Sequence, residues 1–82
     1  MNNNINNPLS DLINDEVYEL LDRHGLINKK SVRDYLIRKR FNNLREKEIT
    51  AGKAIEYIQK DYPYLQFDSI RKIIYNKSNY QN

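Results

Sequence analysis

The stretch AGKAIEYIQKDYPYLQFDSIRKIIYN, residues 51–76, contains two apolar patterns separated by Pro63. Apolar residues recur at helical spacing on each side of this proline, which predicts two short helices joined by a turn. Because the residue before a proline is disfavoured in the α region, the first helix is expected to end before Tyr62. The expected N-caps are Thr50 for the first helix and Gln66 or Asp68 for the second. The residues that form the two apolar patterns are Ala51, Ala54, Ile55 and Ile58, then Ile70, Ile73 and Ile74.

A long basic helix is expected upstream, over residues 31–47, because this stretch lacks glycine and proline and is rich in helix formers. It starts between Asn28 and Ser31, and Ser31 with Asp34 three residues later approximates a capping box. Its apolar residues fall in two strips, so we expect its two ends to pack on different partners. One strip is Val32, Tyr35 and Leu36, and the other is Ile37, Phe41 and Leu44. Two basic rows flank the second strip: Arg33, Arg40 and Lys47 form one row, and Arg38 and Arg45 form the other.

A first helix is expected to begin at Asn7 and Pro8, since asparagine caps helices and proline fits their first turn. Gly25 followed by Leu26 suits its end, a left-handed cap with a hydrophobic contact. Its apolar stripe is Leu9, Leu12, Ile13, Val17, Leu20 and Leu21. The predicted fold is all-α, a compact bundle of four helices ending in a helix-turn-helix-like pair. The predicted organisation is a disordered Asn-rich N-terminus at 1–7, a single helical domain at 8–76 and a polar tail at 77–82.

The composition of the 82-residue chain limits its chemistry. With no cysteine and a single histidine, His24, we expect no disulfide, no thiolate nucleophile and no metal site. Acid pairs on the first helix have no neighbour that would position a substrate, and no Gly-rich phosphate loop occurs, so we expect no catalytic residues, no enzyme activity and no cofactor. No apolar run approaches the roughly 18 residues of a membrane span, and no signal peptide is apparent. We therefore expect no membrane partner and a cytoplasmic location, in the nucleoid or in a host cell.

The charge is polarised along the chain. Residues 1–22 hold five acids and no base, whereas residues 23–82 hold fourteen bases and six acids, so −5 and +8 give the net +3. Residues 29–47 alone hold eight bases and two acids. Such a basic stretch indicates a polyanionic partner. Because the acidic first helix cannot face phosphates, we expect it to pack across the back of the next two helices or to form a dimer surface.

Two stretches resemble small bacterial and phage helix-turn-helix proteins. DSIRKIIY, residues 68–75, is similar to the S-x-x-T-I-R-x-I-I run that closes many of them. RDYLIRKRFNNLREKEITAGKAIEYI, residues 33–58, is similar to a basic helix that leads into the motif in some of them. In this motif a small residue lets the two helices approach, here Ala54, and the second helix lies in the major groove of DNA. The turn before Asp68 departs from the common pattern, because it is longer and lacks the usual glycine.

The resemblance and the basic charge together predict a double-stranded DNA-binding protein, sequence-specific or architectural, that acts as a small transcriptional regulator. Helix 68–76 is expected in the major groove, and the basic helix 31–47 on phosphates. Arginine and lysine suit guanine edges and phosphates, asparagine suits adenine, and serine and tyrosine suit phosphate oxygens. A module this small reads few base pairs, so a homodimer or paired sites are expected. The predicted DNA-binding residues are Arg38, Lys39, Arg45, Lys53, Ser69, Arg71, Lys72, Tyr75 and Asn76.

A protein-interaction module is the alternative hypothesis, such as a phage accessory or virion protein that docks on an acidic protein partner. Seven tyrosines favour it, because tyrosine is common in interfaces. Tyr57, Tyr62 and Tyr64 surround the predicted turn and form either an interaction patch or the edge of the core. Binding that persists at high salt, without nucleic-acid affinity, is the outcome that supports this alternative. RNA is a third hypothesis, although the sequence shows neither an aromatic-bearing sheet nor a GXXG loop.

Overall fold

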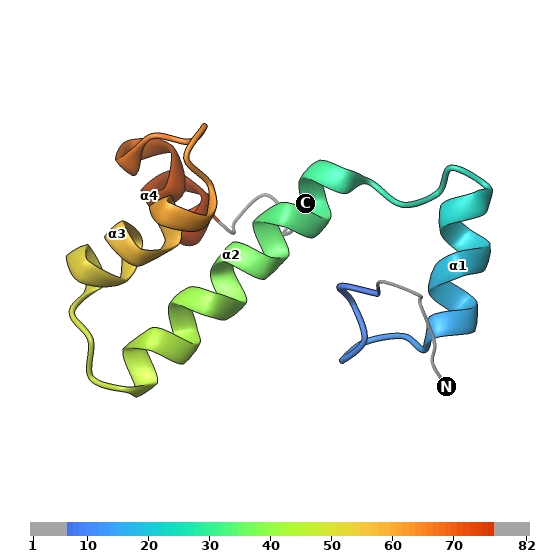
Figure 1. Ribbon diagram of the computed structural model, residues 1–82, viewed down its shortest axis with the longest axis horizontal. Coiled ribbons are helices and arrows are strands. Elements are labelled where there is room, and N and C mark those ends of the chain that lie inside the picture. The colour runs from blue at the N-terminus through green and yellow to red at the C-terminus, as the bar shows by residue number, and fades with distance from the viewer. Residues whose placement is uncertain (1–6, 77–82) are drawn as a thin grey trace. The chain divides into compact units, whose positions relative to one another are not determined.

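The computed structural model describes residues 7–76, which form four helices and no strand (Figure 1). The helices are α1 (Asp15–Arg23), α2 (Lys29–Glu46), α3 (Ala51–Asp61) and α4 (Phe67–Tyr75). The predicted all-α class with four helices is therefore confirmed. The polar tail at 77–82, and all of the Asn-rich start except Asn7, lie outside the described residues.

The chain divides into two compact units at the bond between Arg33 and Asp34. The first unit contains α1, the second contains α3 and α4, and α2 begins in the first unit and ends in the second. The prediction of one helical domain over residues 8–76 stays a prediction.

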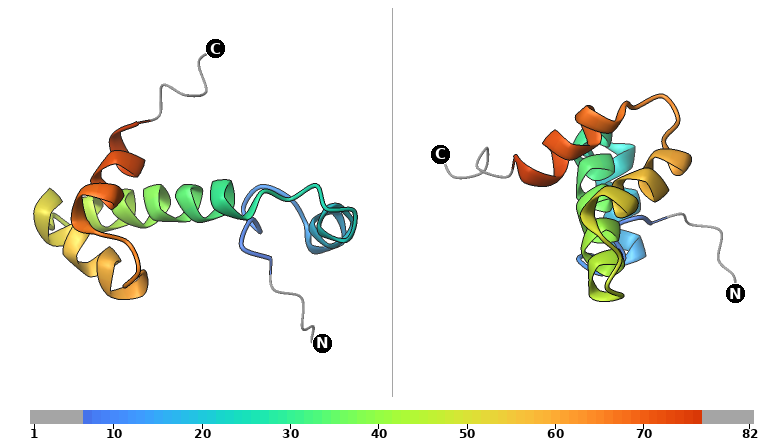
Figure 2. Two further views of the ribbon diagram at one scale, coloured as in Figure 1. Left: turned by 90° about the horizontal axis from the view of Figure 1, so that it is seen from above. Right: turned by 90° about the vertical axis from the view of Figure 1, so that its left-hand side faces the viewer.

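The core of the second unit is built from three helices. Figures 1 and 2 show α3 and α4 gathered against the C-terminal part of α2. The predicted Ile37–Phe41–Leu44 strip of α2 faces this core, where Ile37 and Phe41 are buried and Leu44 packs at the edge. Ala54 is fully buried, as expected for the small residue at a close helix approach. Burying each isoleucine stabilises the fold by roughly 1.5–3 kcal/mol. The other buried members of the cluster are Ile55, Ile58, Ile70 and Ile74.

The turn from α3 to α4 works without glycine. Tyr62 caps the end of α3, so the expected stop before this residue is confirmed. The backbone N–H of Leu65 donates to Tyr62 O at 2.9 Å, and the Gln59 amide donates to Leu65 O at 3.1 Å. Leu65 also packs against the core. Among the described residues only Gly25 and Glu48 have positive φ, so no position in this turn requires the left-handed region that favours glycine.

The caps of α3 and α4 follow the expected positions. Thr50 precedes α3, and its hydroxyl accepts from the backbone N–H of Lys53 at 3.4 Å. Gln66 is the N-cap residue of α4, although its side chain makes no capping hydrogen bond. Asp68 lies in the first turn of α4, where the helix dipole favours a negative charge.

The end of α2 contains a left-handed residue that sequence reasoning missed. Glu48 has φ +66°, and its backbone N–H donates to Arg45 O at 2.9 Å. The N–H of Ile49 donates to Leu44 O at 3.2 Å, and both of these side chains pack against the core. These are the two hydrogen bonds and the apolar contact of a Schellman cap. A glutamate therefore occupies a position that usually favours glycine.

The expected start of the first helix is wrong: α1 begins at Asp15 rather than at Pro8. Asn7 instead holds a separate set of turns, because its side chain accepts from the N–H of Leu9 at 2.9 Å and donates to Ile13 O at 3.0 Å. Asn14 caps α1 by accepting from the N–H of Val17 at 2.8 Å. Two local asparagine caps thus divide what the apolar spacing predicted as one helix.

The predicted end of α1 is confirmed in its hydrogen bonds. Gly25 has φ +69°, its N–H donates to Asp22 O, and the N–H of Leu26 donates to Leu21 O. These bonds form a second Schellman cap. Leu26, which was expected to make the hydrophobic contact of this cap, is 68% exposed.

The second helix begins at Lys29, inside the range from Asn28 to Ser31 that the sequence predicted. The side chain of Asn28 accepts from the N–H of Ser31 at 3.0 Å, so Asn28 caps α2 and the Ser31–Asp34 capping box is not its start. Lys29, the first residue of α2, donates to Asp22 at 3.0 Å. This hydrogen bond raises the pKa of Lys29 above its ordinary value.

Candidate nucleic-acid interface

The α4 helix has a buried ridge and an exposed polar face. Ile70 and Ile74 are buried, and Ile73 packs at the edge of the core. All five predicted DNA-binding residues of this helix and its C-cap are exposed: Ser69, Arg71, Lys72, Tyr75 and Asn76. The same nine-residue helix therefore supplies core side chains on one side and potential DNA contacts on the other.

The exposed face of α4 consists of two lines of side chains. Helical spacing aligns Ser69, Lys72 and Asn76 on one line, at i, i+3 and i+7. Asp68, Arg71 and Tyr75 have the same spacing and form the second line. Tyr75 ends this second line against α2, where its ring meets Phe41 edge-on at 6.0 Å between centroids. The Tyr75 line therefore ends on the side of α4 nearer α2.

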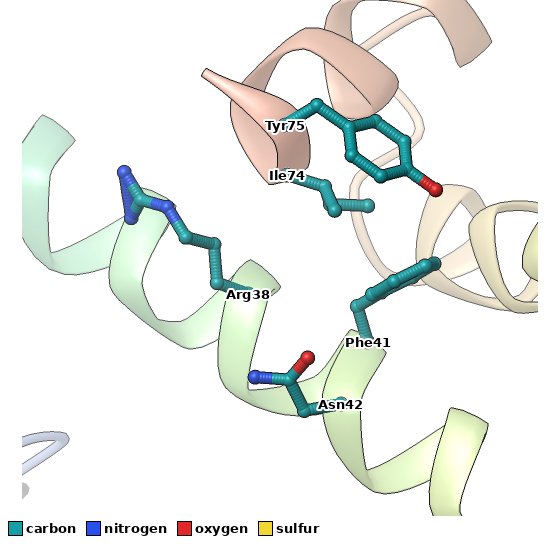
Figure 3. A pocket seen from close by; sticks show the side chains of 5 residues that line it. All are labelled: Arg38, Phe41, Asn42, Ile74 and Tyr75. Atoms are coloured by element: carbon teal, nitrogen blue, oxygen red, sulfur yellow. The ribbon is translucent and has the colours of Figure 1, made fainter. Parts of the chain in front are cut away.

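Arg38 and Tyr75 line one shallow pocket between α2 and α4. Figure 3 shows Phe41 and Ile74 at its centre, with Arg38 and Asn42 rising from α2 and Tyr75 from α4. Its volume is about 190 Å³, smaller than the roughly 300–1,000 Å³ of a small-molecule site. The pocket therefore marks the place where the surfaces of α2 and α4 adjoin.

The two basic rows of α2 lie on different sides of the core. Arg40 pairs with Asp61 at the end of α3, with its Nε 3.3 Å from Oδ2, so its row faces α3. Arg38, in the other row, lines the pocket with α4 residues. Arg45, of the same row, donates from Nη1 to Ile49 O at 2.9 Å. Of these three arginines, Arg38 is the one that lines a pocket with residues of the candidate recognition helix.

Lys39 and Lys53 are not among the residues that line the pocket. Lys39 is an exposed residue of α2. Lys53 is exposed in the first turn of α3, and its Nζ lies 4.0 Å from Glu56. Asn42 is a pocket residue that sequence reasoning missed. Its position four residues after Arg38 was the available signal, because residues at i and i+4 share a helix face.

Acidic side chains reduce the net positive charge of the second unit. Residues 34–76 contain nine bases and six acids, which gives a net charge of +3. Asp68 pairs with Arg71 on α4, with Oδ1 3.4 Å from Nε. Both side chains are about half exposed or more, and such surface pairs contribute only about 0–1 kcal/mol. Arg71 is therefore able to exchange Asp68 for a phosphate or a base at little cost.

The described residues contain no group of three His, Cys, Asp or Glu side chains that is able to hold a metal ion. Within residues 7–76, no helix combines the length and the apolar character that crossing a membrane requires.

Comparisons with protein-family models, with curated proteins and with solved structures gave no match.

Proposed function

We propose that this chain is a double-stranded DNA-binding protein that inserts α4 into the major groove and contacts phosphates through α2. The observation that carries the proposal is the meeting of the polar face of α4 with the Arg38 row of α2 at Tyr75 (Figure 3). Polar and basic side chains on two adjoining helices suit a duplex, which presents base edges between two lines of phosphates.

The dimensions of α4 fit this role. Nine residues at about 1.5 Å rise give a helix roughly 13 Å long, and the major groove is about 12 Å wide and accepts a helix. The buried Ile70 and Ile74 fix the side of α4 that faces the protein. The outward line is then the one that enters the groove.

The two lines of α4 support different contacts. Ser69, Lys72 and Asn76 form the line whose end lies away from α2, and we assign the base edges to it, with Lys72 suited to guanine and Asn76 to adenine. Arg71 and Tyr75, on the line that ends at α2, are assigned to the neighbouring phosphates together with Arg38. Phosphate contacts set the position of the helix, and base contacts set the sequence preference.

The finer role that we propose is a small transcriptional regulator. A nine-residue helix reads few base pairs, so occupancy of a regulatory site depends on the phosphate contacts as well. We assign further phosphate contacts to Lys39, Arg45 and Lys53, which are exposed. With about five phosphate contacts, the logarithm of the affinity falls with the logarithm of salt with a slope of about −4 to −5.

The first test is a fluorescence-anisotropy titration of a labelled duplex of about 25 base pairs with the full chain at about 50 and about 200 mM salt. We expect micromolar or tighter binding at the lower salt and a loss of at least about a hundredfold at the higher salt. The absence of binding at low salt would overturn the proposal.

A charge reversal at Arg71 tests whether α4 lies against the DNA. Arg71→Glu is expected to weaken binding at least about tenfold with unchanged helicity, because it places an acid beside DNA in addition to Asp68. Lys30→Glu is the matched control, since Lys30 is exposed, lies in the first unit and undergoes the same change of charge. Equal losses from both variants would mean that only the net charge matters.

A protein-interaction role is the second candidate, and the exposed aromatic residues favour it. Tyr64 in the turn is 68% exposed and Tyr57 on α3 is 40% exposed, whereas Tyr62 packs against the core. Aromatic side chains of this kind are common in interfaces with acidic or other protein partners. Binding to a protein that persists at high salt, and that Tyr64→Ser abolishes, would support this candidate.

A further inference from the structure

The first unit leaves one face of α1 uncovered. Val17 and Leu20 lie three residues apart on this face and are 39% and 48% exposed. In the stretch before the helix, Leu12 is 60% exposed. Three apolar side chains predicted for a buried stripe are therefore exposed, and Tyr18 is buried in their place.

The first unit has almost no core of its own. Tyr18 is its only buried hydrophobic residue among those that the structure describes. A unit this small buries too little apolar surface to be stable without additional contacts. An apolar face on such a unit indicates a place where a partner adds the missing burial.

The charged residues beside this face include an acid and a base, which would pair with the base and the acid of a second copy. Glu16 and Arg23 are seven residues apart, so they lie on one edge of α1, next to the Val17–Leu20 face. On the side of α1 away from this face, Asp22 pairs with Lys29 of the same unit at 3.0 Å, and Lys29 also lies over the Tyr18 ring. The Val17–Leu20 face therefore has beside it an acid and a base that are too far apart to pair with each other within one helix.

We propose that α1 pairs in an antiparallel, two-fold symmetric manner with α1 of a second copy of this chain. In the register that places Val17 against Leu20 of the second copy, Glu16 lies beside Arg23 of the second copy, and Arg23 beside Glu16 of the second copy. A two-fold interface requires this kind of self-complementarity. The antiparallel arrangement also places the N-terminus of each helix near the C-terminus of the other, which their dipoles favour. This interface does not rest on DNA binding.

The proposed interface is small, so we expect its affinity to be weak. A nine-residue helix presents two or three apolar side chains, so the buried area falls at the low end of specific interfaces. We expect a dissociation constant on the order of 10–100 µM, a range typical of reversible association.

Charge-swap variants test this inference by sedimentation equilibrium of the full chain without DNA. Glu16→Arg and Arg23→Glu each create two like-charge contacts across the two-fold axis, and we expect each to weaken the dimer about tenfold. The double variant Glu16→Arg/Arg23→Glu restores both pairs and the affinity. An equimolar mixture of the two single variants forms a heterodimer in which both pairs are again attractive.

The mixture separates the interface from a loss of folding, because a damaged helix is not repaired by a second damaged helix. Circular dichroism of each variant checks that helicity is retained. A chain that stays monomeric up to about ten times the expected dissociation constant overturns the inference, whatever else covers the α1 face. A dimer that forms with unchanged affinity in the single variants, or a mixture that does not associate, overturns it as well.

Discussion

Glu48 adopts a left-handed backbone conformation that is unfavourable for a residue with a β-carbon. Its φ of +66° is required by the Schellman cap that ends α2 and sends Ile49 to the core. A left-handed conformation costs a residue with a β-carbon roughly 1–2 kcal/mol. The cap persists because the burial of Leu44 and Ile49 and the two cap hydrogen bonds outweigh this strain. A glycine at this position would remove the strain, because it has no β-carbon.

Replacing Glu48 by glycine is therefore expected to stabilise the second unit. Glu48→Gly relieves the left-handed strain but adds chain entropy to the unfolded state, so we expect a net gain of about 0.5–1 kcal/mol in the free energy of unfolding. Urea denaturation followed by circular dichroism measures this difference. Glu46→Gly is the control, since Glu46 is the last residue of α2 and its φ is negative. We expect this control to lose up to about 1 kcal/mol, and a loss in both variants would contradict the interpretation.

At the scale of the element, three sets of side chains lie on different sides of α4. Its isoleucine ridge packs on α3 and α2, its Tyr75 line ends at the α2 pocket, and its Lys72 line is exposed. A helix of nine residues accommodates the three sets because its period places them at different angles around one axis.

The division predicts different consequences for two substitutions in DNA binding. Lys72→Ala is expected to cost about 1–3 kcal/mol on a preferred site and to reduce the discrimination between sequences. Arg38→Ala is expected to weaken binding to all duplexes by a similar factor and to make the salt slope less steep by about one. Titrations of each variant against a selected site and a scrambled duplex measure both effects. A reversal of the two patterns would mean that the lines of α4 are assigned to the wrong contacts.

At the scale of the whole molecule, the chain combines an acidic α1 with a basic α2. The acids of residues 1–22 precede all fourteen bases, and the negative charge of α1 belongs to the first unit. The candidate DNA surface belongs to the second unit. If both proposals hold, a weak dimer couples two copies of α4, and DNA with two sites gains affinity from their effective concentration.

We expect duplexes with two half-sites to bind at least about tenfold more tightly than duplexes with one, at a centre spacing of about 10–10.5 base pairs or a multiple. Arg23→Glu is expected to abolish this gain and to leave the single-site affinity unchanged, because Arg23 lies on α1. Anisotropy titrations over a series of spacings measure both quantities. A gain that survives Arg23→Glu would show that the coupling does not use α1.

The helical elements of the second unit could be predicted because their signals are local. Thr50, Pro63 and the isoleucine spacing of α4 act within a few residues of chain, and the structure has the cap, the stop and the buried ridge where these signals predict them. The first helix could not be predicted in the same way. Asn7 and Asn14 each offer a local cap, and the competition between them is decided by hydrogen bonds to Ile13 and Val17 rather than by apolar spacing.

The sequence by itself determined the all-α class, the bounds of α3, and the inward and outward sides of α4, because a helix with a fixed period needs no distant contact to define its faces. Only the tertiary structure decided which basic row of α2 adjoins α4. Arg40 turns to Asp61 and Arg38 to the Tyr75 pocket because the Ile37–Phe41 strip is buried between α3 and α4, and that burial fixes the rotation of α2 about its axis.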